Sequence, residues 1–177
     1  IANTFNEVDI YKNNIPILRK SFVSPISTSG FETYDYVLND STVIDTKKFY
    51  RIYFFPRRNG DLAFEGSFLV SDKSFAITKI KMKIRDDINL NFVRKLSFEK
   101  EYLIKNDSIF LPKLDRYTGD FTFADKDEEN KGLTIKKTTS YAKYQFEKPL
   151  KDNFYSNKIV KFRPDQYVKE NSYFKFK

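Results

Sequence analysis

The stretch YRIYFFPRRNGDLAFEGSFLVSDKSFAITKIKMKIRDDINLNFV, residues 50–93, decides the fold of this chain. Residues 49–55 are apolar or aromatic apart from Arg51, which is typical of a strand buried on both faces. The run 62–70 places apolar side chains at every second position. An Asn-Gly turn after Pro56 separates these runs, because Asn-Gly tolerates the positive φ angles of a tight hairpin. The stretch therefore predicts consecutive antiparallel strands joined by short turns.

The clearest strand is the run 76–85, which follows a Ser-Asp-Lys turn at 71–73. Its apolar face carries Ile80, Met82 and Ile84, and its basic face carries Lys79, Lys81, Lys83 and Arg85. A slip of one residue would bury four cations, so the pairing register of this strand is strongly specified.

The remaining sequence is also mostly strand-like. Further strands are expected at 31–38, 96–105, 108–111, 114–123 and 133–147, with an acidic hairpin loop at 125–130. Residues 86–95 predict a loop or one helical turn, and the other weak helical signals lie within 1–20 and 150–170. We expect a mainly β fold: a curved antiparallel sheet of roughly seven to nine strands that forms an incomplete (half) β-barrel with one or two short helices. Residues 1–150 would form this domain, and 151–177 a C-terminal extension, a strand or a linker.

Composition restricts the chemistry. The 177 residues include 19 Phe and 12 Tyr but no Cys and no His, which removes thiolate nucleophiles, Cys-based metal sites and the commonest general base. We therefore expect no enzyme activity, no cofactor and no metal site. The acidic loop at 125–130 does not have the spacing of a calcium-binding EF-hand loop. The net charge of +8 favours anionic partners, although solubility alone also explains it.

Two candidate sites follow from the strand pattern, each with a plainer alternative. An apolar cavity that could hold acyl chains would be lined by Phe64, Phe68, Val70, Ile80, Met82 and Ile84. The alternative is that these side chains fill an ordinary core. A contact with an anionic surface would use Arg57, Arg58, Lys79, Lys81, Lys83 and Arg85. The alternative is a solvated sheet face.

Five short motifs resemble a known family. They are SFVSPI (21–26), YDYVLND (34–40), FFPRR (54–58), LAFEG (62–66) and NLNFV (89–93). In this order they resemble the middle segment of an uncharacterised family of large outer-membrane proteins from Bacteroidota. Members of that family carry a signal peptide and a carboxypeptidase-regulatory-like sandwich before this segment, and a predicted outer-membrane β-barrel after it. A weaker similarity of shape links the strand pattern to periplasmic lipoprotein carriers.

The resemblance implies a function without naming a reaction. It places the chain at the periplasmic face of the outer membrane, with its own barrel and sandwich domain as partners. We expect a non-catalytic module that binds or guides a lipid, a lipoprotein or another envelope ligand, or that docks to its own barrel. The alternatives are a structural spacer or protein-interaction domain, and then nucleic-acid or carbohydrate binding. No specific nucleic acid is expected, because a recognisable aromatic–basic signature is missing.

Overall fold

The computed structural model describes residues 8–106, 108–122, 132–144 and 146. The chain divides into two compact units, Ile1–Ala142 and Lys143–Lys177, and the described sheet lies in the first. The predicted extension at 151–177 and the predicted acidic loop at 125–130 lie outside the described residues. No helix in the described part of the chain is both long and apolar enough to cross a membrane.

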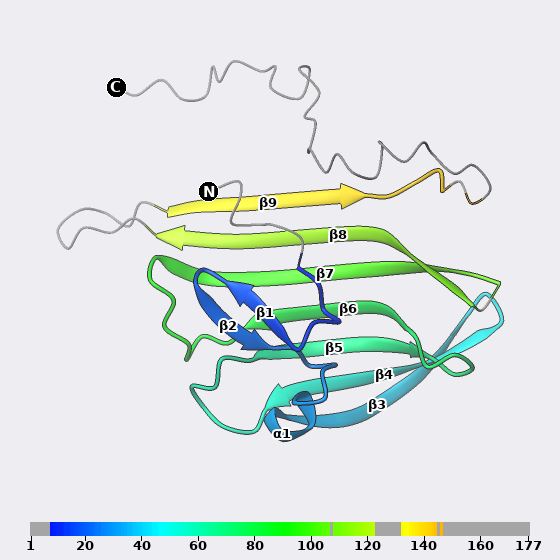
Figure 1. Ribbon diagram of the computed structural model, residues 1–177, viewed down its shortest axis with the longest axis horizontal. Coiled ribbons are helices and arrows are strands. Elements are labelled where there is room, and N and C mark those ends of the chain that lie inside the picture. Colours follow the sequence, from blue (N-terminus) through cyan, green and yellow to red (C-terminus); the bar gives the residue numbers. More distant parts are fainter. Residues whose placement is uncertain (1–7, 107, 123–131, 145, 147–177) are drawn as a thin grey trace, which may run out of the picture. The chain divides into compact units, whose positions relative to one another are not determined.

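One antiparallel sheet dominates this first unit (Figure 1). Its seven strands follow one another in chain order, so each of the five inner strands pairs with the strand before it and the strand after it, and β3 and β9 form the edges of the described sheet. They are β3 (Tyr34–Ile44), β4 (Lys47–Pro56), β5 (Phe64–Ser71), β6 (Ile77–Ile84), β7 (Val93–Lys105), β8 (Ile109–Thr122) and β9 (Gly132–Ser140). A single short helix, α1 (Gly30–Thr33), precedes β3 among the described residues. The predicted mainly β, curved antiparallel architecture is confirmed.

A separate hairpin precedes the sheet. Strand β1 (Asn14–Ile17) pairs with β2 (Lys20–Val23) across a two-residue turn at Leu18 and Arg19, whose φ angles are +46° and +67°. The weak helical signal in residues 1–20 is therefore wrong at 14–17. The physical reason is the alternation of Ile15 and Ile17 with polar or exposed neighbours, which buries one face of a strand.

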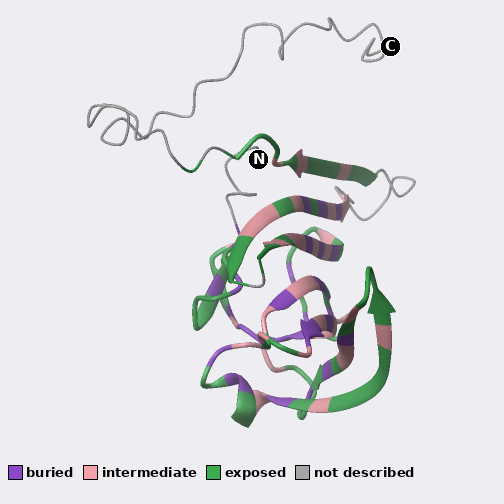
Figure 2. Ribbon diagram, turned by 90° about the vertical axis from the view of Figure 1, so that its right-hand side faces the viewer, coloured by how far each residue is buried: buried purple, intermediate pink, exposed green. Residues whose placement is uncertain are grey.

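The hairpin fills the inner face of the sheet. Ile15, Ile17 and Phe22 are buried in the same hydrophobic core as the inner residues of β4 to β8. The rings of Phe22 and Phe64 lie 5.2 Å apart, which joins the hairpin directly to β5. Each such buried side chain contributes about 1.5–3 kcal/mol relative to exposure. In Figure 2 the strands of the sheet curve around this inner region, where buried residues gather.

The backbones of β5 and β6 approach each other closely at Gly66. Gly66 of β5 pairs with Met82 of β6. A Cβ atom at position 66 would lie 2.0 Å from the carbonyl oxygen of Lys81, so any side chain there would collide with backbone. Glycine therefore allows β5 and β6 to approach each other in the centre of the sheet.

Two details of the strand prediction need correction. The runs 108–111 and 114–123 form the single strand β8, because a bulge opposite Glu101 and Tyr102 absorbs the irregularity between them. Strand β4 is not buried on both faces: Phe54 is 1% exposed, whereas Tyr53 and Phe55 are 42% and 41% exposed. The hairpin covers the inner face alone, so the aromatic residues at the alternate positions of β4 remain on the outside.

Candidate functional site

The outer face of the sheet carries the candidate site. Strand register brings five side chains into one row across β4 to β8: Tyr53, Ser67, Lys81, Glu99 and Arg116. These residues alternate along their strands with the buried residues of the inner face. The row therefore lies on the side of the sheet opposite to the hairpin.

A second row runs beside the first. Glu65 pairs with Lys83, Lys83 with Ser97, and Ser97 with Thr118. Together the two rows border a trough of about 590 Å³. Small side chains, Ser67 and Ser97, stand between longer ones in these rows, and this difference in length creates the hollow. The rings of β4 close one end of the trough, and β8 closes the other.

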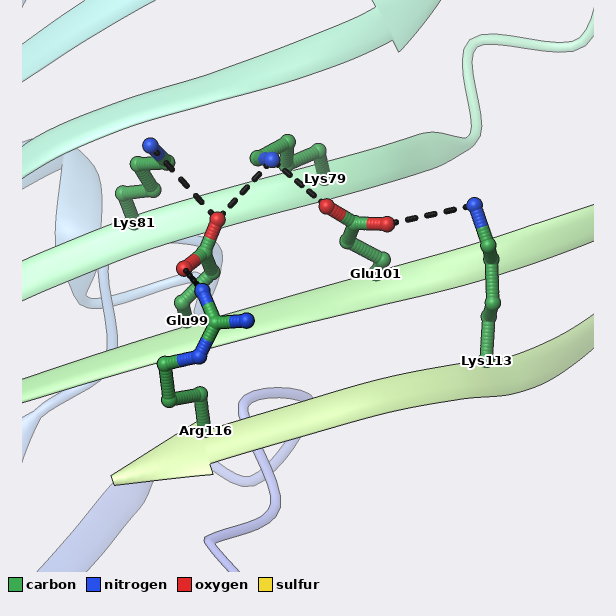
Figure 3. Close-up of polar contacts among 6 residues, drawn as sticks. All are labelled: Lys79, Lys81, Glu99, Glu101, Lys113 and Arg116. Atoms are coloured by element: carbon green, nitrogen blue, oxygen red, sulfur yellow. Dashed lines mark hydrogen bonds and ion pairs between the residues drawn. The ribbon is translucent and has the colours of Figure 1, made fainter. Parts of the chain in front are cut away.

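An ion-pair network orders the charged side chains of this face (Figure 3). One oxygen of Glu99 lies 2.8 Å from the ammonium of Lys79 and 3.5 Å from that of Lys81. Its other oxygen lies 2.7 Å from a guanidinium nitrogen of Arg116. Lys79 also contacts Glu101 at 2.5 Å, and Glu101 contacts Lys113 at 3.3 Å. Three strands are thus linked by charge-assisted contacts, which hold these side chains in place.

Glu99 is the centre of this network, and its side chain is 15% exposed. Burial alone would raise the pKa of Glu99, but the hydrogen bond from Lys79 and the charges of Lys79, Lys81 and Arg116 lower it. The hydrogen bond from Lys79 likewise lowers the pKa of Glu101, against the opposing effect of burial. Both carboxylates therefore stay ionised at neutral pH and accept hydrogen bonds.

The structure gives each of the six predicted surface cations a carboxylate partner. On β6, Lys79, Lys81 and Lys83 contact Glu99, Glu99 and Glu65, respectively, and the last distance is 2.7 Å. Near the turns, the pairs are Arg57–Asp35, Arg58–Asp61 and Arg85–Asp87. Contact with an anionic surface would require these cations to leave or share their carboxylates. That hypothesis stays a prediction.

The predicted apolar cavity residues lie elsewhere. Phe64, Phe68, Val70, Ile80, Met82 and Ile84 all belong to the hydrophobic core beneath the hairpin. Met82 is the one member of this set that also borders the outer trough. The structure therefore places the set where the plainer alternative expected it, among packed core side chains.

A buried ion pair lies on the inner face. The ammonium of Lys100 is 2.8 Å from a carboxylate oxygen of Asp115, and the two side chains are 7% and 5% exposed. The hydroxyl of Tyr141 donates to the same oxygen over 3.2 Å. The backbone N–H of Val8 donates nearby to the hydroxyl of Tyr117. The pair connects β7 and β8 beside the N-terminal segment, and we assign it a structural role.

Sequence reasoning missed the residues that make the trough: Tyr53, Phe55, Ser67, Ser97, Glu99 and Arg116. A signal was present for Glu99, because Glu99 and Glu101 alternate with buried residues of β7 as the lysines do in β6. Two neighbouring strands with opposite charges at alternate positions indicate cross-strand ion pairs.

Comparison with known proteins gives a family but no activity. A model for a family of unknown function, DUF5686, matches residues 2–144. No curated protein and no solved structure matches the chain.

Proposed function

The chain belongs to the DUF5686 family of unknown function, and from its site alone we propose a non-catalytic binding module whose contact surface is the outer sheet face. The observation that carries this proposal is the contrast between the two faces. The inner face is filled by the chain's own hairpin, whereas the outer face combines an open trough with charged side chains held in ion pairs. A surface of ordered, accessible side chains is suited to binding.

The setting that we propose is the periplasmic side of the outer membrane in Bacteroidota. Support comes from the five motifs between residues 21 and 93, which resemble the segment between the sandwich and the barrel of large outer-membrane proteins. In that arrangement the trough would meet components of the cell envelope. The flanking sandwich and barrel would hold the module close to the membrane.

Two rival functions receive less support. A carrier of acyl chains needs space among its apolar side chains, but the predicted cavity residues are buried in the core. A spacer without a ligand agrees with the filled core. It gives no reason for two exposed aromatic rings beside the trough, where Tyr53 is 42% and Phe55 is 41% exposed. Exposed aromatic residues that gather at one site are typical of contact surfaces.

The 177 residues contain no cysteine, so a single thiol can be placed at a chosen position of this segment, and labelling of the protein without the new thiol measures the background. Ser67→Cys places a thiol in the trough, and Ser108→Cys places one in the exposed turn between β7 and β8. Each variant is labelled with a maleimide reagent, once in the purified 177-residue chain and once in the native protein in its outer membrane. We expect labelling at position 67 to slow by about tenfold in the membrane, as for a contact surface, and labelling at position 108 to change little.

For each site, the labelling rate in the membrane is divided by the rate in the purified chain, so the different exposure of the two sites cancels. Equal slowing at both positions would reflect reagent access to the membrane instead of contact at the trough. Unchanged labelling at position 67 would contradict the proposed contact surface.

A further inference from the structure

The trough offers two kinds of chemistry side by side. At its β4 end stand the exposed rings of Tyr53 and Phe55, and along β5 to β8 stand hydroxyl and charged groups. We propose that this trough binds a neutral oligosaccharide, a chain of sugar rings without charged substituents. The inference rests on the proposed function and names the class of ligand for the same surface.

Charge is the first argument for a neutral ligand. Three cations and two carboxylates border the trough: Lys81, Lys83, Arg116, Glu65 and Glu99. Both carboxylates already pair with these cations, at distances between 2.7 and 3.5 Å. A charged ligand would have to displace one of these internal partners or share a cation with it, which weakens the existing ion pair. A sugar hydroxyl, by contrast, donates to a carboxylate and accepts from an ammonium or guanidinium group while the ion pair stays intact.

The aromatic rings are the second argument. Tyr53 and Phe55 lie on the outer face, so they contribute little to the core that the hairpin completes. Aromatic side chains supply a large apolar contact area at small conformational cost. The C–H faces of a sugar ring match such a surface, while the hydroxyls at its edge reach the polar groups beyond. One ligand class therefore uses both ends of the trough.

Direction and size are the third argument. The trough crosses five strands, β4 to β8, and four strand spacings of about 4.8 Å give a length of about 19 Å. The trough runs across β4 to β8. Each of these five strands has a hydrogen-bonded neighbour on both sides, so their backbone groups are already used in the sheet. An extended peptide lying there would find no backbone partners for its own N–H and C=O groups. A sugar chain carries its hydrogen-bonding groups on every ring and depends on side chains alone.

The network around Glu99 holds these side chains ready for a ligand. Figure 3 shows Lys81 and Arg116 meeting Glu99 from the two neighbouring strands. Side chains that are fixed before binding lose less conformational entropy when a ligand arrives. The short side chains of Ser67 and Ser97, which also border the trough, give a sugar room to approach and offer it two hydroxyl groups.

The test begins with the purified 177-residue chain on an array of neutral and acidic glycans. Neutral glycans that bind are titrated into the ¹⁵N-labelled chain. We expect amide shifts at Ser67, Ser97 and Thr118, and little change of affinity with added salt because no ion pair is exchanged. Tyr53→Ala should weaken binding about tenfold, as the loss of one aromatic contact predicts. Phe75→Ala, in an exposed turn outside the trough, is the matched control and should leave affinity unchanged.

A second variant guards against misfolding. Ser97→Arg inserts a long side chain into the trough and should abolish binding, with a circular dichroism spectrum like that of the parent. Binding of acidic glycans alone, shifts outside the trough, equal losses in Tyr53→Ala and Phe75→Ala, or no binding on the array would each overturn the inference. If Ser67→Cys is still protected in the membrane while no neutral glycan binds, the ligand class fails and the contact surface stands. If that protection is also missing, both fail.

Discussion

The hydroxyl of Tyr34 joins three segments of the core. It donates a hydrogen bond of 2.6 Å to the carbonyl of Val23, at the end of the hairpin, and accepts one of 2.9 Å from the N–H of Phe64 in β5. The Tyr34 ring is fully buried and meets Phe54 edge to face at 5.7 Å. Tyr34→Phe keeps this ring and removes the hydroxyl, so a carbonyl and an N–H lose their partner together.

The expected cost follows from these two groups. A buried polar group left without a partner costs about 1–3 kcal/mol, so the loss at two groups in Tyr34→Phe should lower the free energy of unfolding by about 2–6 kcal/mol. Tyr36→Phe is the matched control, because the Tyr36 hydroxyl donates one bond of 2.6 Å, to Pro25, and the side chain is half-buried. Its loss should be about 0.5–1.5 kcal/mol.

Urea unfolding followed by far-ultraviolet circular dichroism measures both variants, since the chain has no Trp for fluorescence. The two should unfold with the parent's denaturant dependence and differ in midpoint. In Tyr34→Phe, hydrogen exchange at the Phe64 amide should also speed up. If Tyr34→Phe costs no more than Tyr36→Phe, the hydroxyl does not hold the hairpin to the sheet, and the reasoning fails.

Three further predictions concern ionised groups. The pKa of Glu99 is lowered in the fold, so its contribution to stability is present above the unfolded pKa of about 4.3 and is lost as pH falls through the folded pKa. In Glu99→Gln the free energy of unfolding should therefore depend less on pH in the acid range, as measured by circular dichroism. Burial raises the pKa of Tyr102, so the free energy of unfolding should fall as pH rises above about 10, where the unfolded side chain ionises. In Tyr102→Phe this fall should be smaller when unfolding in urea is measured at alkaline pH. Lys100→Met leaves the carboxylate of Asp115 buried and should cost about 3–5 kcal/mol, whereas Lys100→Met with Asp115→Leu should recover most of that loss in a double-mutant cycle.

Strands with strong alternation were predictable from the sequence. The even positions 80, 82 and 84 of β6 are buried and its lysines lie on the other face, as the pattern requires. The hairpin at 14–23 was not predictable in the same way, because its strands have four residues each. Runs that short contain too few alternations to distinguish a strand from one turn of helix.

The trough was hidden for a different reason. Glu99 lies opposite Lys81 on one side and Arg116 on the other. The alternation of charges indicates that these strands form ion pairs, but it does not fix the register that decides which residues lie opposite each other. Hydrophobicity also misled the prediction at β4, where Tyr53 and Phe55 suggested burial on both faces. A single sequence cannot show which face its own hairpin will cover.

Most of the surplus positive charge lies outside the part of the chain that contains the sheet. Nine Lys and Arg and four Asp and Glu lie in residues 143–177, so five of the eight surplus positive charges belong to that segment. The first unit, which ends at Ala142, holds the other three, and its prominent cations on β6 are paired with carboxylates. The overall charge of +8 is therefore a poor guide to the sheet face. The charged side chains of the outer sheet face are paired with one another, and aromatic rings stand at one end of the trough. An uncharged ligand with many hydroxyl groups therefore suits this face better than an anion.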